Sequence, residues 1–245
     1  MITVTIDKER LKQFEAYELK KGGHKKLAEG MCVMEAAAWI AREPWSDKTK
    51  CVSRVLGAFL RSWNDSLDDA TRQKLKPYAA RVVGTANDGH DEWRAWLCVD
   101  WLARTQLPVW LDLAELQEHA AAVRALIAIS TPESASLAQT TLAAARAAAW
   151  DAAGDAAGAT VRAAAWDAAG AAAGEAAGAA VRAAVRAAAG DAVWDAVRAA
   201  VRSAAWAAAG DAVRSAAWAA LEPSVLALQA SAFTLLDRMI EGPRE

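Results

Sequence analysis

The hydrophobic and polar positions of the second half of the chain repeat every four residues, from Arg146 to Leu221. The first position of each tetrad holds Arg, Trp or Gly, and the second holds Ala, Asp, Glu or Ser. The third is Ala except at Thr160, and the fourth is Ala or Val until the final Leu221. Ala is the strongest helix former, and Arg and Glu also favour helices, so the pattern predicts a helical repeat array.

The first positions of the tetrads form a stripe of Trp, Arg and Gly. A site that accepts side chains of such different size is not one tightly packed core position. Arg and Trp four residues apart are neighbours on a helix, where a guanidinium over an indole contributes about 0.5–1 kcal/mol. Because Trp and Arg dominate binding hot spots, the stripe is a candidate partner-binding surface. Its candidate residues are Arg146, Trp150, Arg162, Trp166, Trp194, Arg198, Arg202, Trp206, Arg214 and Trp218.

The pattern leaves two questions open. The indoles of the stripe either face solvent or fill the gaps of a self-packed helical bundle. The Gly residues followed by Asp or Glu either end one helix and begin the next or lie inside a continuous helix. These Gly residues are at 154, 174, 190 and 210. The near-invariant third position also predicts a column of Ala along which helices approach each other closely.

Helical periodicity and turn signals predict that most of the first 130 residues are helical. A short strand is expected over 2–6, and Asp7 is expected to cap the helix that follows it. The expected helices cover 8–21, 25–42, 50–64, 68–82, 88–106 and 110–127. Thr131 followed by Pro132 is typical of a helix start, so the array is expected to begin there.

Pro223 is expected to break the array. A final amphipathic helix over 223–240 is predicted to cap it, and Gly242 and Pro243 are expected to stop this helix. The predicted fold is therefore all-α. It consists of an N-terminal helical domain over 1–130, an Ala-rich helical repeat region over 131–222, and a capping C-terminal helix within 223–245.

The composition of the chain limits the classes of partner it is expected to bind and the cellular compartment in which it is expected to lie. The formal net charge is −2, which argues against nucleic acid and anionic membranes as partners. No apolar run approaches the roughly 20 residues of a membrane span, and the N-terminus lacks the apolar segment of a signal peptide. The cysteines Cys32, Cys51 and Cys98 are an odd and sparse set, which favours reduced thiols and a cytoplasmic location.

Motifs for catalysis or metal binding are weak. The chain has no HExxH, GxSxG, phosphate-loop or GxGxxG motif. His24, Cys32, Glu35 and Cys51 carry groups that bind metals, but they lack the spacing of a zinc site, and buried Cys is the simpler interpretation. We therefore expect no enzyme activity, no cofactor and no metal.

Two charged segments have alternative interpretations. Glu43 and Asp47 flank Trp45 in a loop, where they either perform acid–base chemistry or, as we expect, end and cap helices. The basic turn at 20–26, together with the nearby Lys48 and Lys50, is expected to be a solvated surface, with contact to an anionic partner as the alternative.

Three stretches of the first half carry a resemblance to a known family. They are GGHKKLAEGMCVMEAAAWIAREPWSDKTKCVSRVLGAFLRSWNDSL (22–67), RQKLKPYAARVVGT (72–85) and DWLARTQLPVWLDLAEL (100–116). With the tetrads that follow, the chain resembles uncharacterised proteins of actinobacteria and their phages. These proteins have an immunity-protein-five-like domain and an Ala/Trp/Arg-rich tail, and some are labelled as immunity proteins.

The resemblance implies a non-enzymatic binding protein with an immunity-like role, which neutralises a toxin or effector. It supplies no catalytic residues. We expect a protein partner, bound through the Trp/Arg stripe. The alternative is a self-assembling structural or scaffold protein of a phage or prophage, in which the Ala columns drive formation of a homo-oligomer.

Overall fold

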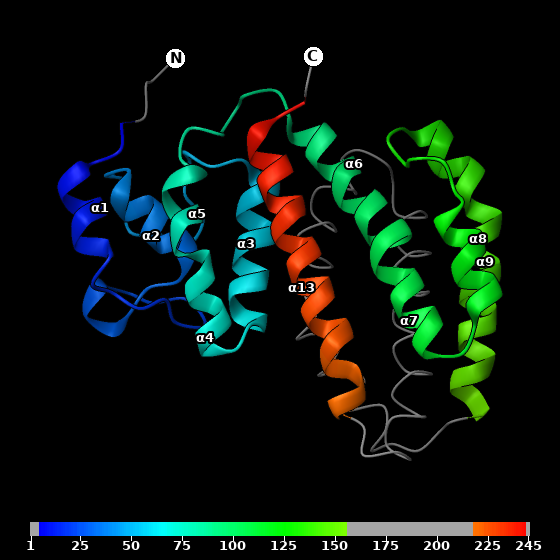
Figure 1. Ribbon diagram of the computed structural model, residues 1–245. Coiled ribbons are helices and arrows are strands. Elements are labelled where there is room, and N and C mark those ends of the chain that lie inside the picture. The colour runs from blue at the N-terminus through cyan, green and yellow to red at the C-terminus, as the bar shows by residue number, and fades with distance from the viewer. Residues whose placement is uncertain (1–4, 156–217, 244–245) are drawn as a thin grey trace. The chain divides into compact units, whose positions relative to one another are not determined.

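The computed structural model describes residues 5–155 and 218–243 (Figure 1). The chain divides into two compact units. Among the described residues, unit 1 comprises 5–94 and 236–243, and unit 2 comprises 95–155 and 218–235. The described segments are helices joined by loops, with an isolated β-bridge between Leu19 and Met31, so the fold is all-α as predicted. Across these segments, no helix is long and apolar enough to span a membrane.

Unit 1 is organised around α2. Helix α2 contacts α1, α3 and α5, and its residues Ala36, Ala37 and Ala38 are completely buried. Small side chains let the surrounding helices approach the backbone of α2 closely. The helices are α1 (Lys8–Phe14), α2 (Val33–Ile40), α3 (Arg54–Ser66), α4 (Asp69–Arg72) and α5 (Lys76–Arg81), with 3₁₀ turns at Leu27–Glu29 and Gln73–Leu75.

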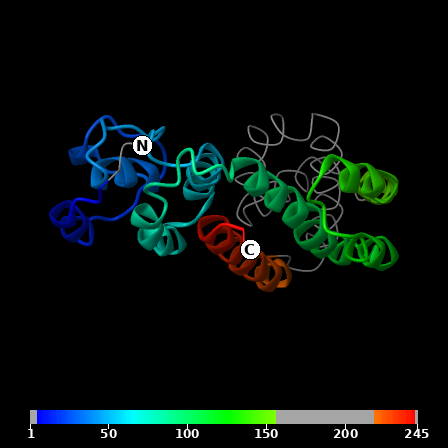
Figure 2. The ribbon, with the colours of Figure 1, turned by 90° about the horizontal axis from the view of Figure 1, so that it is seen from above.

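Unit 2 contains α7 (Leu107–Leu113), α8 (Gln117–Arg124) and α9 (Pro132–Asp155), and α8 packs against both α7 and α9. Figure 2 shows α9, in yellow-green, beside the green α8. Two long helices pass from one unit to the other. They are α6 (Asp91–Trp101), which continues through a π-helical turn (Leu102–Gln106) into α7, and α13 (Trp218–Glu241).

The predicted helix over 8–21 is wrong beyond residue 14. Asp7 caps α1 as expected, because its carboxylate accepts hydrogen bonds from the N–H groups of Glu9 and Arg10. The helix then stops so that Leu19 can be buried in an extended segment. There the side chain of Gln73 bonds both the N–H and the carbonyl of Leu19, each at 2.9 Å. Of the strand expected over 2–6, residues 5 and 6 are not in a strand, and 2–4 lie outside the described residues.

The predicted helix over 25–42 is also shorter, because α2 begins only at Val33. Gly30 has a φ of +124°, which excludes it from a helix. Cys32 and Glu35 then form a capping box. The Cys32 sulfur accepts from the Glu35 N–H at 3.4 Å, and the Glu35 carboxylate accepts from the Cys32 N–H at 2.8 Å.

The remaining N-terminal helices also differ from their predicted bounds. The helix expected over 50–64 begins after Ser53, which caps α3. The one expected over 68–82 is divided into α4, a 3₁₀ turn and α5. The one expected over 110–127 is split into α7 and α8 at Glu115, whose φ is +60°.

Two prolines, Pro108 and Pro223, lie inside helices. The π-helical turn widens the helix immediately before Pro108, which relieves the clash of the ring with the preceding turn. Pro223 was expected to break the array, but α13 runs through it from Trp218 to Glu241. Its position near the start of α13 costs one backbone hydrogen bond without ending the helix. The stop at Gly242 is confirmed, with a φ of +82°. The predicted domain boundaries at 130 and 222 stay predictions.

The last turns of α13 are held in unit 1 by buried and half-buried charges. The fully buried Arg94 donates from Nε to the carbonyl of Met239 at 2.8 Å. Its terminal nitrogens donate to the two carboxylate oxygens of Asp88 at 2.7 and 2.6 Å. Arg81 forms an ion pair with Asp237 on α13 at 2.6 Å. A cation at the carbonyl end of a helix satisfies a group that the helix itself cannot.

We predict that Arg94→Leu destabilises the protein by about 3 kcal/mol, because it leaves Asp88 and the Met239 carbonyl without their main donor. Urea unfolding followed by circular dichroism measures the difference. Arg124→Leu is the matched control, because Arg124 pairs with Asp112 at an exposed site and surface pairs contribute about 1 kcal/mol or less. Equal losses for both variants would contradict a structural role for Arg94.

Asp88 is expected to make stability depend on acid pH. Burial alone would raise the pKa of Asp88, but hydrogen bonds from Arg94 and from the His90 N–H outweigh it and lower the pKa. This stabilisation is fully present above the pKa of the unfolded state, about 3.9, and is lost as the pH falls through the lower pKa of the folded state. Asp88→Asn should therefore be less stable than the wild type at pH 7, and the gap should narrow below about pH 4. Unfolding midpoints at pH 7, 5 and 3 test this, and a constant gap would refute it.

Candidate partner-binding surface

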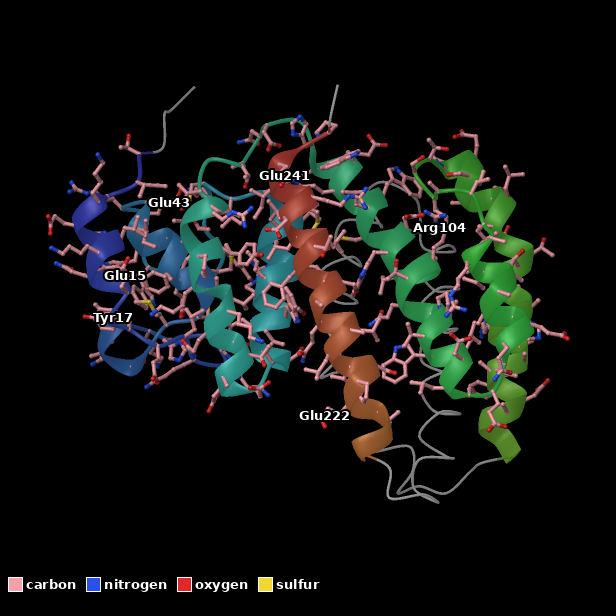
Figure 3. The ribbon with its side chains drawn as sticks, in the orientation of Figure 1. Glu15, Tyr17, Glu43, Arg104, Glu222 and Glu241 are labelled. Atoms are coloured by element: carbon pink, nitrogen blue, oxygen red, sulfur yellow. The ribbon has the colours of Figure 1, made fainter. Side chains whose placement is uncertain are left out.

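The connection between α8 and α9 is held by the ion pair of Arg104 and Asp100, which lies where α6 continues into the π-helical turn. The Arg104 side chain, labelled in Figure 3, donates from Nε to Asp100 at 2.6 Å and from Nη1 to the Leu126 carbonyl at 2.8 Å. Asp100 in turn accepts from the N–H of Ile129 at 2.8 Å. Both ends of this short connection are thus fixed, and they determine where α9, the first helix of the repeat region, begins.

The start of α9 is the predicted one. Thr131 Oγ1 accepts from the Ser134 N–H at 3.2 Å, and Ser134 Oγ accepts from the Thr131 N–H at 3.0 Å. Pro132 is the first helical residue, where its missing N–H costs nothing. Two hydrogen bonds lower the pKa of Glu133 in the first turn. The larger effect comes from the backbone N–H of Glu133 and the smaller from the side chain of Thr131. The negative charge at this end suits the helix dipole.

The buried side of α9 does not follow the four-residue repeat. It is formed by residues with an exposed fraction of 1% or less: Ala135, Ala138, Leu142, Ala145 and Ala149. Their spacing alternates between three and four residues, which keeps one side of an α-helix facing a neighbour.

The burial of α9 bears on the predicted column of Ala. At this end of the array, the fourth position of the tetrad is buried, at Ala145 and Ala149. The third position is only half-buried, at Ala148 and Ala152. The close-contact column predicted for the third position is therefore wrong here. Its other members lie beyond the described residues.

The first two residues of the Trp/Arg stripe face solvent. Arg146 is exposed, and the Trp150 side chain is 61% exposed. Both lie on α9, beside the buried Ala145 and Ala149. The predicted stacking of Arg146 on Trp150 is absent: the cation–π contacts within the described segments involve Trp39, Phe14 and Tyr78 instead.

The rest of the stripe is not placed. Trp218 begins α13, and nothing is described of its side chain. The other candidates lie outside the described residues: Arg162, Trp166, Trp194, Arg198, Arg202, Trp206 and Arg214. Within the described residues, the structure thus shows an exposed surface at one pair of stripe residues.

A second exposed apolar residue of α9 lies on another side of the helix. Leu137 is 72% exposed and precedes Trp150 by thirteen positions, which corresponds to a rotation of about 140° around the helix. The two side chains therefore do not form one patch. Leu137 instead shares a strip with the exposed Ala144 and the half-buried Ala148.

Gln106 and Trp110 are an unexpected feature of unit 2. Both are buried, and neither the amide group of Gln106 nor the indole N–H of Trp110 has a hydrogen-bond partner in the described structure. An unsatisfied buried polar group costs about 1–3 kcal/mol. The sequence around them, TQLPVW, has no signal that distinguishes this Gln from an exposed one.

The candidate metal ligands are used structurally. Glu35 accepts hydrogen bonds from Nδ1 of His24 at 2.9 Å and from the N–H groups of His24 and Cys32, so it ties a loop to the start of α2. Cys51 instead contacts Thr49. Within the described ranges, no group of three or more His, Cys, Asp or Glu side chains is placed to hold a metal ion.

The thiols are buried and weakly acidic. Burial raises the pKa of Cys32 and of Cys98 to about 12, and it also raises the pKa of Cys51. Because the thiolate is the nucleophile, these cysteines are poorly suited to covalent chemistry at neutral pH.

The carboxylates of Glu43 and Asp47, on either side of Trp45, have different partners. Glu43 accepts from the Thr49 hydroxyl and from the Lys50 N–H, and Asp47 lies 3.9 Å from Arg61. Each therefore contacts the loop over 42–50 or its neighbour Arg61, and, contrary to expectation, neither side chain caps α2 or α3.

Searches of known protein families, of curated proteins and of solved structures find no match to this chain.

The exposure of Trp150 predicts a fluorescence result. Trp150→Phe should lower the fraction of tryptophan emission that acrylamide quenches, because it removes an accessible indole. Trp110→Phe is the matched control, since that indole is 1% exposed and its removal should not lower the quenchable fraction. If Trp110→Phe lowered that fraction and Trp150→Phe did not, Trp150 would be packed against the protein.

Proposed function

We propose that this chain is a non-enzymatic protein-binding protein with an immunity-like role, which neutralises a toxin or effector in the cytoplasm. One observation supports the proposal above others. The Trp150 indole is 61% exposed beside the exposed Arg146, on a helix that also carries the buried Ala145 and Ala149. A single exposed indole is common on soluble proteins. The sequence, however, repeats this pair along the array, and a repeated Trp/Arg surface has the composition of binding hot spots.

The chemistry of the described residues supports binding rather than catalysis. The thiols are buried, and His24 is tied to Glu35. Free, buried cysteines also suit a reducing compartment such as the cytoplasm.

A self-assembling phage or prophage scaffold is the second candidate. The observation that favours it is the strip of Leu137, Ala144 and Ala148 on α9, none of which is buried. Small side chains along such a strip let a helix of a second copy approach closely.

Site-specific photocrosslinking distinguishes the two candidates. A photoreactive phenylalanine analogue is placed at position 150, at 148, or at the exposed Glu118 of α8 as a control. In cells of the source organism, the binding protein should crosslink from 150 to one other protein, and the scaffold should crosslink from 148 to a second copy. Equal products from 150 and 118 would contradict a specific surface at Trp150.

The affinity for the captured protein provides the quantitative test. Removal of a hot-spot indole costs about 2 kcal/mol, or about thirtyfold in Kd. Trp150→Ala should show a loss of this size in calorimetry with purified components. Leu137→Ala, on the other side of α9, should leave the Kd within about twofold. An unchanged Kd for Trp150→Ala would refute this part of the proposal.

A further inference from the structure

A polar groove lies in unit 1, apart from the surface proposed on α9. Its volume is about 470 Å³, which is within the range of small-molecule sites. One wall is the extended segment 18–21, which follows Tyr17 (labelled in Figure 3), and the other is formed by residues of α4 and the turn after it. The charged lining residues are Glu18, Lys20, Lys21, Asp69 and Arg72.

The two walls are fixed to each other by hydrogen bonds. Gln73 bonds both backbone groups of Leu19, as described above, and Asn64 Nδ2 donates to the Lys20 carbonyl at 2.9 Å. Asn64 is completely buried and also accepts from the Val33 N–H at 3.2 Å. The groove therefore exists before any ligand binds, which reduces the entropy that binding costs.

A buried guanidinium lines this groove. Arg72 is only 3% exposed. It donates to the carbonyls of Asn64 and Leu67 and to the carboxylate of Asp69. These three bonds use one N–H on each nitrogen, so each terminal nitrogen keeps a second N–H for another acceptor.

The carboxylate of Asp69 occupies the position beside Arg72 that an anionic ligand would take. Its side chain is 95% exposed, whereas that of Arg72 is 4% exposed. An exposed carboxylate gains little from such a pair, because water and salt screen it. Asp69 can therefore turn into solvent at small cost, provided that another anion takes its place at the buried guanidinium.

We propose that this groove binds a small phosphate-bearing molecule, with Arg72 and Lys21 as the cations that contact it and Asp69 as the anion that it displaces. Lys20, whose Nζ donates to the Glu29 carbonyl at 3.4 Å, adds a nearby positive charge. Charge decides between phosphate and carboxylate. With Asp69 turned out, three cations and Glu18 remain, for a net charge of +2. A phosphate monoester carries about −1.5 to −2 at pH 7 and balances this charge, whereas a carboxylate balances half of it.

Calorimetric titration with inorganic phosphate, and with acetate at the same ionic strength, tests the proposal on the full chain. Phosphate should bind with a Kd of about 1 mM or tighter, and acetate about tenfold more weakly. Lys21→Glu should weaken phosphate binding about tenfold. Lys74→Glu makes the same charge change at an exposed residue outside the groove and should leave the Kd within about twofold.

Asp69→Ala gives the opposite and more specific result. Because it removes the competing anion, it should tighten phosphate binding about threefold. Glu9→Ala is the matched control for charge alone, since Glu9 is exposed on α1 and does not line the groove. Circular dichroism confirms that each variant is folded. The proposal is overturned if phosphate does not bind, if Lys21→Glu and Lys74→Glu weaken it equally, or if Asp69→Ala fails to tighten it beyond Glu9→Ala.

Discussion

Short helices impose the constraint on which unit 1 depends. Its helices α1, α2, α4 and α5 have 7, 8, 4 and 6 residues. Every α-helix leaves four N–H and four carbonyl groups at its ends without partners inside the helix, so most backbone groups of these helices need partners elsewhere. Buried polar side chains supply some of them: Glu35 and Asn64 accept from the N–H groups of Cys32 and Val33 at the start of α2. The apolar core around α2 can close only because these bonds are made.

The same arrangement recurs where longer helices meet loops or chain ends. Arg94 binds the Met239 carbonyl near the end of α13 and pairs with Asp88. In unit 2, Arg104 binds the Leu126 carbonyl before α9 and pairs with Asp100. In each case an arginine satisfies a carbonyl that no helix can satisfy, and an aspartate balances its charge. Arg72 and Asp69 follow this pattern too, with the difference that their aspartate is almost fully exposed and therefore replaceable.

The four-residue repeat conflicts with the geometry of a straight helix. The buried stripe of α9 recurs every three or four residues, whereas each tetrad advances about 40° beyond one turn. No single position of the tetrad can therefore stay against the same neighbour along a straight helix. At the described end, the fourth position is buried and the Trp/Arg stripe faces solvent. At this end of the array, a slot that accepts Trp, Arg and Gly is therefore compatible with a packed helix.

The sequence by itself determined the features that depend on neighbouring residues. These are the all-α class, the cap at Asp7, the start of α9 at Pro132 and the stop at Gly242. Each follows from hydrogen bonds or allowed backbone angles within about one helical turn. The exposure of Trp150 was one of two alternatives that the repeat left open, and the packing of Ala145 and Ala149 decided it.

Only the tertiary structure decided where a helix ends when residues far away in the sequence determine that end. Helix α1 ends early because Leu19 bonds Gln73, which is 54 residues away. Pro108 lies within a helix because a π-helical turn precedes it. The groove also depends on such distant pairing, since its two walls are separated by about fifty residues of sequence and meet through side-chain hydrogen bonds. Local periodicity carries no information about these pairs, because their energy arises only when remote segments are already packed together.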